Sequence, residues 1–175
     1  MKRNLLFGLF TALFVSLVTQ HCLASDAPKV SPERQKFIDY AISLLDTPYK
    51  YAGKTPETGF DCSGYVSYAA NFGAGVLLPP SSSSMYKKVE IIDEREREPG
   101  DLMFFKTTSS GGISHVGIYL GLYHGEGKYK KFKNKRIFIH AASDGPETGV
   151  IISAIDDSYW ANHFAGWGRI LPKTQ

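Results

Sequence analysis

The chain has 175 residues, of which 43% are hydrophobic and 21% are charged, and its formal net charge is +3. This length fits one domain, and the apolar fraction is that of a globular protein, which excludes wholesale disorder. Two cysteines are too few for a disulfide-rich scaffold or a four-thiolate zinc site. The mild positive charge gives no reason to expect nucleic-acid binding.

The first residues have the pattern of a secretory signal. Lys2 and Arg3 precede an uncharged apolar run at 5–18, which is shorter than the roughly 20 residues that span a bilayer as a helix. The run ends at small residues that suit cleavage after Ala24. We therefore predict a signal peptide at 1–24, no transmembrane helix, and export to the periplasm or cell envelope.

A competing hypothesis is a lipoprotein anchored through Cys22, although the residues before this cysteine are not the small ones that such an anchor requires. Beyond the signal we expect a short linker at 25–31 and one domain at 32–175. Cys62 is then the single cysteine of the exported chain. A lone thiol in an oxidising compartment is either buried and inert or kept for its reactivity.

The first half of the mature chain predicts helices. Ser31 followed by proline is typical of a helix start, and apolar residues at helical spacing predict an amphipathic helix at 32–46 that Pro48 stops. The glycine- and proline-containing segment 49–60 predicts a loop.

Asp61 is a good N-cap for a second helix, which we expect to end at Gly73. The serine run 81–84 can cap a short third helix, and the alternating charges at 93–98 indicate a solvated surface. After these helices the pattern changes to short strands, which suggests an α+β domain with an antiparallel sheet. The expected strands are 102–105, 114–120, 136–141, 149–153 and 166–171.

Cys62 falls in the first turn of the second predicted helix. Free N–H groups and the partial positive charge at a helix start favour the reactive thiolate. A small core residue is the alternative interpretation of this cysteine. The polar or small neighbours Asp61, Ser63 and Gly64 favour a site that is open to a ligand.

Two histidines lie in strand-like segments and are candidate partners of the cysteine. Alternation places His115 on one strand face, and His140 occupies a second apolar strand. A cysteine nucleophile needs a base and a group that orients the base, which these two residues can supply. We expect no metal site, because the sequence contains no closely spaced ligand pair. His124 and His163 are expected to be bystanders.

Several segments together resemble the NlpC-type cell-wall peptidases. Each motif alone is weak, whereas all of them in this order and spacing form a specific pattern that covers about 32–171. The matching segments are TPYKYAG at 47–53, DCSGYV at 61–66, PGDLMFF at 99–105, SHVGIYLG at 114–121 and FIHA at 138–141.

The resemblance implies a papain-like minimal fold, in which N-terminal helices pack on a small antiparallel sheet. It implies an exported cysteine endopeptidase that hydrolyses amide bonds in peptidoglycan stem peptides, typically between D-glutamate and a diamino acid. Cys62 is then the nucleophile, His115 the general base, and His140 the residue that orients His115. We expect no cofactor.

The resemblance also implies a substrate site beside the nucleophile. Tyr49 matches a tyrosine that lines this site, with Tyr51 as the alternative. Asp61 and Ser63 match positions that hold the free amine of a terminal L-alanine in some members. A carboxylate beside the nucleophile can pair with an ammonium group and fix the register of a short peptide.

The segment 122–136 departs from the family, whose two histidine strands usually join by a short hairpin. It contains six basic residues interleaved with aromatic ones. One interpretation is an exposed extension kept soluble by its charge. The other is an arm that binds an anionic envelope polymer or a membrane surface. The lysines concerned are Lys128, Lys130, Lys131 and Lys133.

Two alternative functions stay open at the level of the sequence. The first is an amidase or acyltransferase on the same scaffold, since related papain-like branches share these catalytic residues. The second is a non-catalytic wall-binding module with a vestigial site. The presence of Cys62, His115 and His140 together favours an enzyme, because a binding module has no need of a reactive thiol.

Overall fold

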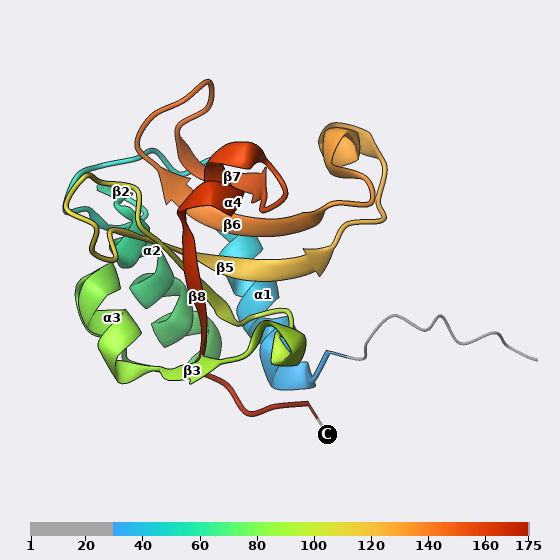
Figure 1. Cartoon of the computed structure of the whole chain (residues 1–175), viewed down its shortest axis with the longest axis horizontal. Coiled ribbons are helices and arrows are strands. Elements are labelled where there is room, and N and C mark those ends of the chain that lie inside the picture. The colour runs from blue at the N-terminus through green and yellow to red at the C-terminus, as the bar shows by residue number, and fades with distance from the viewer. Residues whose placement is uncertain (1–29, 175) are drawn as a thin grey trace, which may run out of the picture.

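The structure, a computed structural model, describes residues 30–174; the predicted signal peptide and most of the predicted linker lie outside this part of the chain. Helices come first and strands follow, so the prediction of an α+β fold is confirmed (Figure 1). The helices are α1 (Pro32–Ser43), α2 (Cys62–Ala69), α3 (Ser82–Lys88) and α4 (Ser158–His163). The longer strands are β4 (Leu102–Phe105), β5 (His115–Leu122), β6 (Arg136–Ala142), β7 (Gly149–Ala154) and β8 (Phe164–Arg169).

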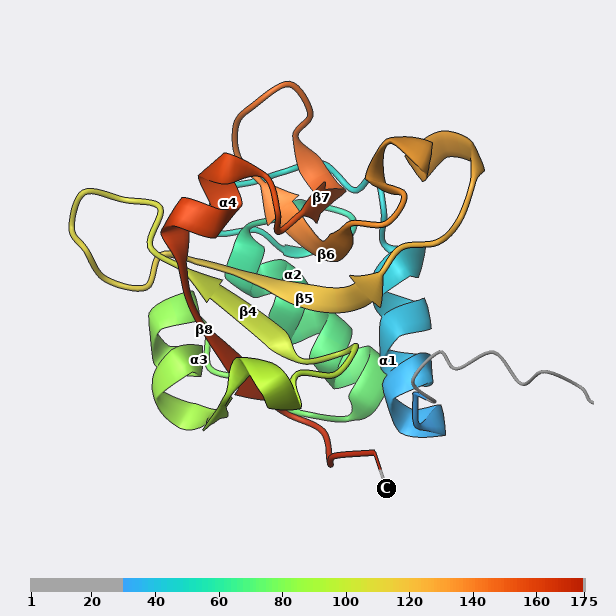
Figure 2. The ribbon, with the colours of Figure 1, turned by 45° about the vertical axis from the view of Figure 1, so that its right-hand side comes forward.

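These strands and the short β3 (Glu90–Ile92) form a six-stranded sheet in the order β3–β8–β4–β5–β6–β7 (Figure 2). Every neighbouring pair is antiparallel. The five strands expected from the sequence are all present, with small shifts at their ends. The sequence did not indicate β3 or α4, which have only 3 and 6 residues.

The start of α1 follows the prediction, and its end does not. Ser31 caps the helix by accepting a hydrogen bond from the Arg34 backbone N–H at 3.3 Å. The helix ends at Ser43 rather than at 46, because the chain turns through Asp46 in the left-handed region (φ 65°). The Asp46 N–H then bonds to the carbonyl of Val150, which ties this turn to the edge strand β7.

The segments around α2 also differ from the sequence prediction. The expected loop 49–60 contains two short paired strands, β1 (Lys54–Thr55) and β2 (Gly59–Phe60). After α2 the chain continues in a π-helical turn, η1 (Ala70–Ala74), which ends at Gly75 rather than Gly73. Gly75 adopts φ 69°, a conformation that glycine takes without strain. The capping of α3 by Ser81 is as predicted.

The core has two parts, one on each face of the sheet. On the helix-covered face, Phe104, Ile118 and Ile139 are fully buried against Phe37 of α1 and Val66 of α2. Burial of an apolar side chain of this size contributes about 1.5–3 kcal/mol. The opposite face holds a smaller, largely aromatic cluster that Trp160 of α4 partly covers. The alternation along β5 places His115 on this aromatic face.

A buried ionic cluster joins the two ends of the domain. Arg34 is fully buried and binds Asp101 at 3.0 Å, and Arg169 binds the other Asp101 oxygen at 2.9 Å. Arg34 also donates to the carbonyls of Leu171 and Pro172, each at 3.0 Å. Buried charges are tolerated when they are paired and fully hydrogen-bonded, as they are here. The cluster fixes α1 to the C-terminal segment.

The charged segment 93–98 is only partly the solvated surface that the sequence predicts. Its first residues are exposed, and Glu94–Glu96 form the 3-10 turn η2. Glu98 is instead mostly covered and binds Arg34 at 3.1 Å. Separately, none of the helices in residues 30–174 is long and apolar enough to cross a membrane.

Candidate active site

Cys62 is the first residue of α2, as the sequence predicts. Asp61 caps the helix, and its Oδ1 accepts a hydrogen bond from the Gly64 N–H at 2.6 Å. The thiol lies 3.9 Å from the carbonyl oxygen of Ser114 and accepts a hydrogen bond from the backbone of Val116. The sulfur therefore contacts the backbone on both sides of His115, at the start of β5.

The environment of the thiol differs from the expectation. Burial raises the pKa of the Cys62 thiol, and the neighbouring Asp61 carboxylate raises it further. The N–H groups of Val116 and Ser63 act in the opposite direction and do not outweigh burial. The N–H at the helix start thus favours the thiolate as predicted, but burial and Asp61 outweigh it, and the net pKa of the thiol is raised. The thiol rests neutral and needs a base.

His115 and His140 meet on the aromatic face of the sheet. His115 Nε2 lies 2.9 Å from His140 Nδ1, and the ring centroids are 4.9 Å apart. Gly117 leaves the room for this arrangement, because a Cβ there would lie 2.7 Å from the Phe138 ring and 3.1 Å from His140 Cβ. The β5–β6 register is irregular only beyond Tyr119, on the side of the extended hairpin.

A serine that sequence reasoning missed extends this pair to a series of three. Ser153 on β7 places its Oγ 3.0 Å from His140 Nε2. For His115 to act as a base at Nδ1, its Nε2 must carry the proton and donate to His140. His140 then donates from Nε2 to Ser153. The contacts Ser153–His140–His115 are thus consistent with one protonation pattern, which leaves His115 Nδ1 without a proton.

Both imidazoles are held uncharged by their surroundings. His140 is fully buried and His115 is 9% exposed. Burial lowers the pKa of His115 to about 4, and burial together with the neighbouring His115 lowers the pKa of His140 well below its usual value. Trp160, which the sequence did not single out, covers both rings at centroid distances of 5.2 and 4.7 Å.

The predicted substrate residues lie on the other side of Cys62. Tyr49 pairs with Phe60, the residue before Asp61, in an isolated parallel bridge. Burial raises the pKa of the Tyr49 hydroxyl, and Cys62 and Asp61 raise it further when they are ionised. Ser63 Oγ donates to Asp61 Oδ1 at 2.8 Å. The alternative residue, Tyr51, is 84% exposed. Tyr49, Asp61 and Ser63 thus all lie in the segments around Cys62 at the start of α2.

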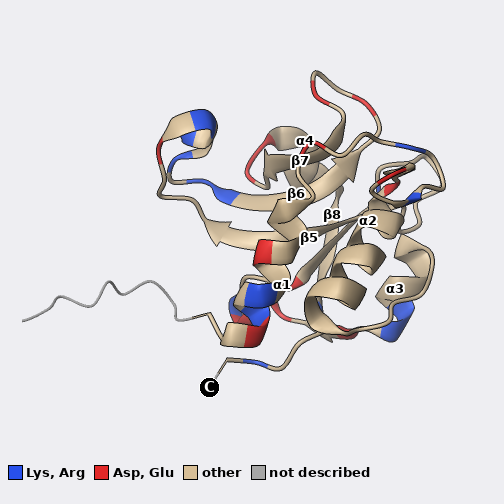
Figure 3. Ribbon diagram, turned by 180° about the vertical axis from the view of Figure 1, so that it is seen from behind, with Lys and Arg blue, Asp and Glu red and all other residues tan. Residues whose placement is uncertain are grey.

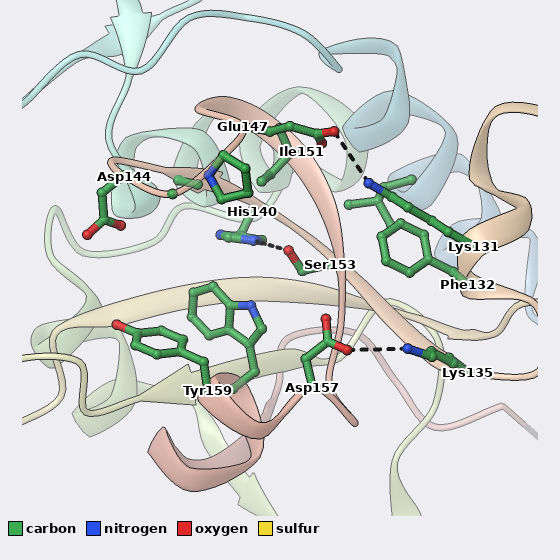
Figure 4. A pocket seen from close by; sticks show the side chains of 15 residues that line it. Lys131, Phe132, Lys135, His140, Asp144, Glu147, Ile151, Ser153, Asp157 and Tyr159 are labelled. Carbon is green, nitrogen blue, oxygen red and sulfur yellow. Dashed lines mark hydrogen bonds and ion pairs between the residues drawn. The ribbon is translucent and has the colours of Figure 1, made fainter.

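A cavity of about 530 Å³ opens beside His140 (Figure 4). His140 and Ser153 line it, together with the Trp160 ring. Asp144 lies at one end (Figure 4), and its charge contributes to the raised pKa of Tyr49. The cavity size is within the range of ligand pockets.

The extended hairpin between β5 and β6 carries the short turn η3 (Gly127–Phe132) and projects from the sheet (Figure 3). Its lysines are exposed except for Lys135, which is half-buried. Most of these lysines are paired with carboxylates, so the hairpin presents mixed charge. The anionic-polymer hypothesis therefore gains no support from the structure. The pairs are Lys128–Asp46, Lys131–Glu147, Lys133–Glu126 and Lys135–Asp157.

The other two histidines of residues 30–174 take no part in this site. His124 is exposed on the hairpin, and His163 binds the carbonyl of Tyr159 within α4 at 2.6 Å. Within residues 30–174, no group of three potential ligand side chains is arranged to hold a metal ion.

Comparison with known proteins agrees with this fold. The model of the NlpC/P60 family matches residues 46–169, and the chain belongs to that family. The chain is 32% identical to murein DD-endopeptidase MepH of Escherichia coli over 83% of its own length and 49% of that protein. It is 36% identical to the bifunctional muramidase/DL-endopeptidase CwlT of Bacillus subtilis over 74% and 34%, respectively.

A solved structure with the same fold is a lipoprotein-like protein of the NLP/P60 family from Staphylococcus aureus. It superposes with a TM-score of 0.63 at 29% identity, over 85% of this chain and 45% of that one. The chain therefore spans about half, or less, of the length of these relatives.

Proposed function

We propose that the protein is an exported cysteine endopeptidase that hydrolyses amide bonds in peptidoglycan stem peptides, with the D-glutamyl–diamino acid bond as its target. The observation that carries the proposal is the hydrogen-bonded series from Ser153 through His140 to His115, which reaches β5 where the Cys62 sulfur lies. Membership of a family with named cell-wall endopeptidases supports the substrate class.

In the first step, His115 Nδ1 takes the thiol proton as Cys62 attacks the carbonyl carbon of the scissile amide. A neutral imidazole is the form that can accept this proton. His140 then stabilises the imidazolium through its bond to Nε2 and keeps the ring in place, as the third member of a catalytic triad does. Burial of both rings limits the rotation that would misalign them.

The tetrahedral oxyanion needs donors, and the backbone N–H of Cys62 at the helix start is the expected one. His115 gives its proton to the leaving amine, and an acyl-enzyme remains on Cys62. Water then attacks the thioester with His115 as base, and the thiol and the carboxylic acid product are released. Tyr49 is the proposed substrate contact beside the acyl group, with Asp61 and Ser63 at the edge of the same site.

The bond that is cut needs its own test, because the relatives are named for different ones. MepH is a DD-endopeptidase and CwlT a DL-endopeptidase. Purified peptidoglycan should be digested with the protein, and the released fragments should be identified by mass spectrometry. We expect new termini at D-glutamate and at the diamino acid. Termini between two D-configured centres would instead give the DD specificity for which MepH is named.

The same digestion tests the chemistry. Cys62→Ser should abolish fragment release, whereas His124→Gln, a change at an exposed histidine, should leave it unchanged. Binding of the wall without any cleavage by the unaltered protein would favour a wall-binding module. Release of a non-peptide amide or an ester product would favour an amidase or acyltransferase. Export is tested separately by locating the mature protein and determining its N-terminus.

A further inference from the structure

The Asp61 side of the nucleophile already holds an ammonium group, and it belongs to the chain itself. Lys54 Nζ lies 3.3 and 3.2 Å from the two Asp61 carboxylate oxygens. It lies 3.4 Å from Ser63 Oγ and 3.3 Å from the carbonyl oxygen of Pro80. Four oxygen atoms around one nitrogen form a complete ammonium site, built from the residues expected to hold a substrate amine.

The backbone fixes this lysine in place. Lys54 pairs with Phe60 in the small β1–β2 sheet, and the Asp61 N–H bonds to the carbonyl of Gly53 at 3.1 Å. The aliphatic stem of Lys54 lies over Gly64, where a Cβ would come within 3.1 Å of Lys54 Cδ. The position of the ammonium therefore follows from the local fold and not only from the flexible end of the side chain.

The charge at this position is balanced. The Asp61 side chain is 15% exposed and that of Lys54 is 45% exposed. A bare carboxylate next to Cys62 would attract a cationic group of a bound peptide. Because Lys54 already neutralises Asp61, the carboxylate does not attract a second cation. A substrate ammonium at the same oxygens would be repelled by the like charge of Lys54 at close range.

We infer that Lys54 takes the place of a substrate ammonium on Asp61 and Ser63, so that this chain selects stem peptides whose N-terminus is a neutral amide over peptides with a free amine. This inference rests on the proposed function and specifies its substrate. It also revises the role that the family resemblance implies for Asp61 and Ser63: in this chain they hold Lys54.

The kinetic test compares one stem peptide in two forms, with a free N-terminus and with an acetylated one. For the wild type we expect kcat/KM to favour the acetylated form by about tenfold, the effect of roughly 1.4 kcal/mol. Lys54→Met, which keeps the length and removes the charge, should shift the ratio toward the free amine by about tenfold. Lys54→Arg should keep the wild-type preference, and so should Lys88→Met on α3, where the lysine is exposed.

A wild type that prefers the free amine would overturn the inference, whatever the variants do. So would a ratio in a folded Lys54→Met protein that stays within twofold of the wild type, with folding checked by the thermal midpoint.

A binding measurement separates this inference from the proposed function. In a Cys62→Ala background, calorimetry should give the Kd of both peptides with and without Lys54→Met. If neither peptide is cut by the wild type, the proposed function fails, yet a tenfold change in the Kd ratio would still uphold the role of Lys54. If both peptides are cut and neither ratio responds to the substitution, the inference alone fails.

Discussion

The two sides of Cys62 are built in opposite ways. On one side His115 and His140 are buried, uncharged and joined to Ser153 by hydrogen bonds. On the other side Asp61 and Lys54 are charged and partly open to solvent. Buried hydrogen bonds are strong and hold fixed positions, whereas a partly exposed ion pair keeps its charges within reach of a bound peptide. The first side therefore suits proton transfer, and the second suits the selection of a substrate.

The largest expected effect comes from the buried side. His115→Gln keeps a polar group near His140 and removes the base, so kcat should fall by about a thousandfold with little change in KM. Steady-state kinetics on the acetylated stem peptide measures this. His124→Gln should change neither constant by more than twofold. A loss of less than tenfold in His115→Gln would show that another group takes the thiol proton.

The second-largest expected effect is a loss of folding stability in acid, which arises from the buried histidines. Because burial lowers the pKa of His115 from 6.5 to about 4, the unfolded chain binds a proton between these values that the folded chain does not. The contribution of neutral His115 to the free energy of unfolding is complete above pH 6.5. It falls by on the order of 3 kcal/mol as the pH drops through this window. The lowered pKa of His140 acts in the same direction.

Urea unfolding at pH 7 and pH 4.5 measures this loss. The comparison with His115→Gln isolates the histidine from the carboxylates, which also titrate in acid, and the variant should lose less stability than the wild type. An equal loss of unfolding free energy between pH 7 and pH 4.5 in the two proteins would show that His115 is not held uncharged by burial.

Ser153→Ala should give a smaller effect, which acts through His140. Without the acceptor on β7, His140 loses the bond that fixes its protonation pattern, and kcat should fall by roughly tenfold while KM is unchanged. Ser153→Thr keeps the hydroxyl and should recover most of the rate. The nitrogen NMR signals of His140 should shift in the alanine variant and not in the threonine variant. Unchanged signals would assign Ser153 a packing role alone.

Local sequence patterns predicted the parts of this site that depend on neighbouring residues. Asp61 before Cys62 is a capping pattern, and the alternation around His115 and His140 predicts two apolar strands. These features need only a few consecutive residues, so the sequence contains them in full. The start of α2 and strands β4 to β7 were predicted to within a few residues for the same reason.

The parts that were missed depend on which segments lie side by side. Ser153 is one small polar residue in an apolar strand, and only the β6–β7 register brings it to His140. Lys54 reaches Asp61 because two very short strands pair, within a segment whose glycine and proline content predicts a loop. The buried Arg34–Asp101 pair joins positions that are far apart in the chain. The direction in which the pKa of the Cys62 thiol shifts also depends on burial, which local sequence patterns do not indicate.

The most direct test of the central claim labels the nucleophile with a substrate analogue. The analogue is the acetylated stem peptide ending at the scissile carbonyl, with a chloromethyl ketone in place of the amide nitrogen. We expect one adduct per chain, which peptide mapping locates on Cys62. The adduct should form more slowly in His115→Gln. An excess of the acetylated stem peptide should slow it by competing for the site. No adduct, or an adduct elsewhere in a protein that still cleaves the peptide, would contradict the assignment of Cys62 as the nucleophile.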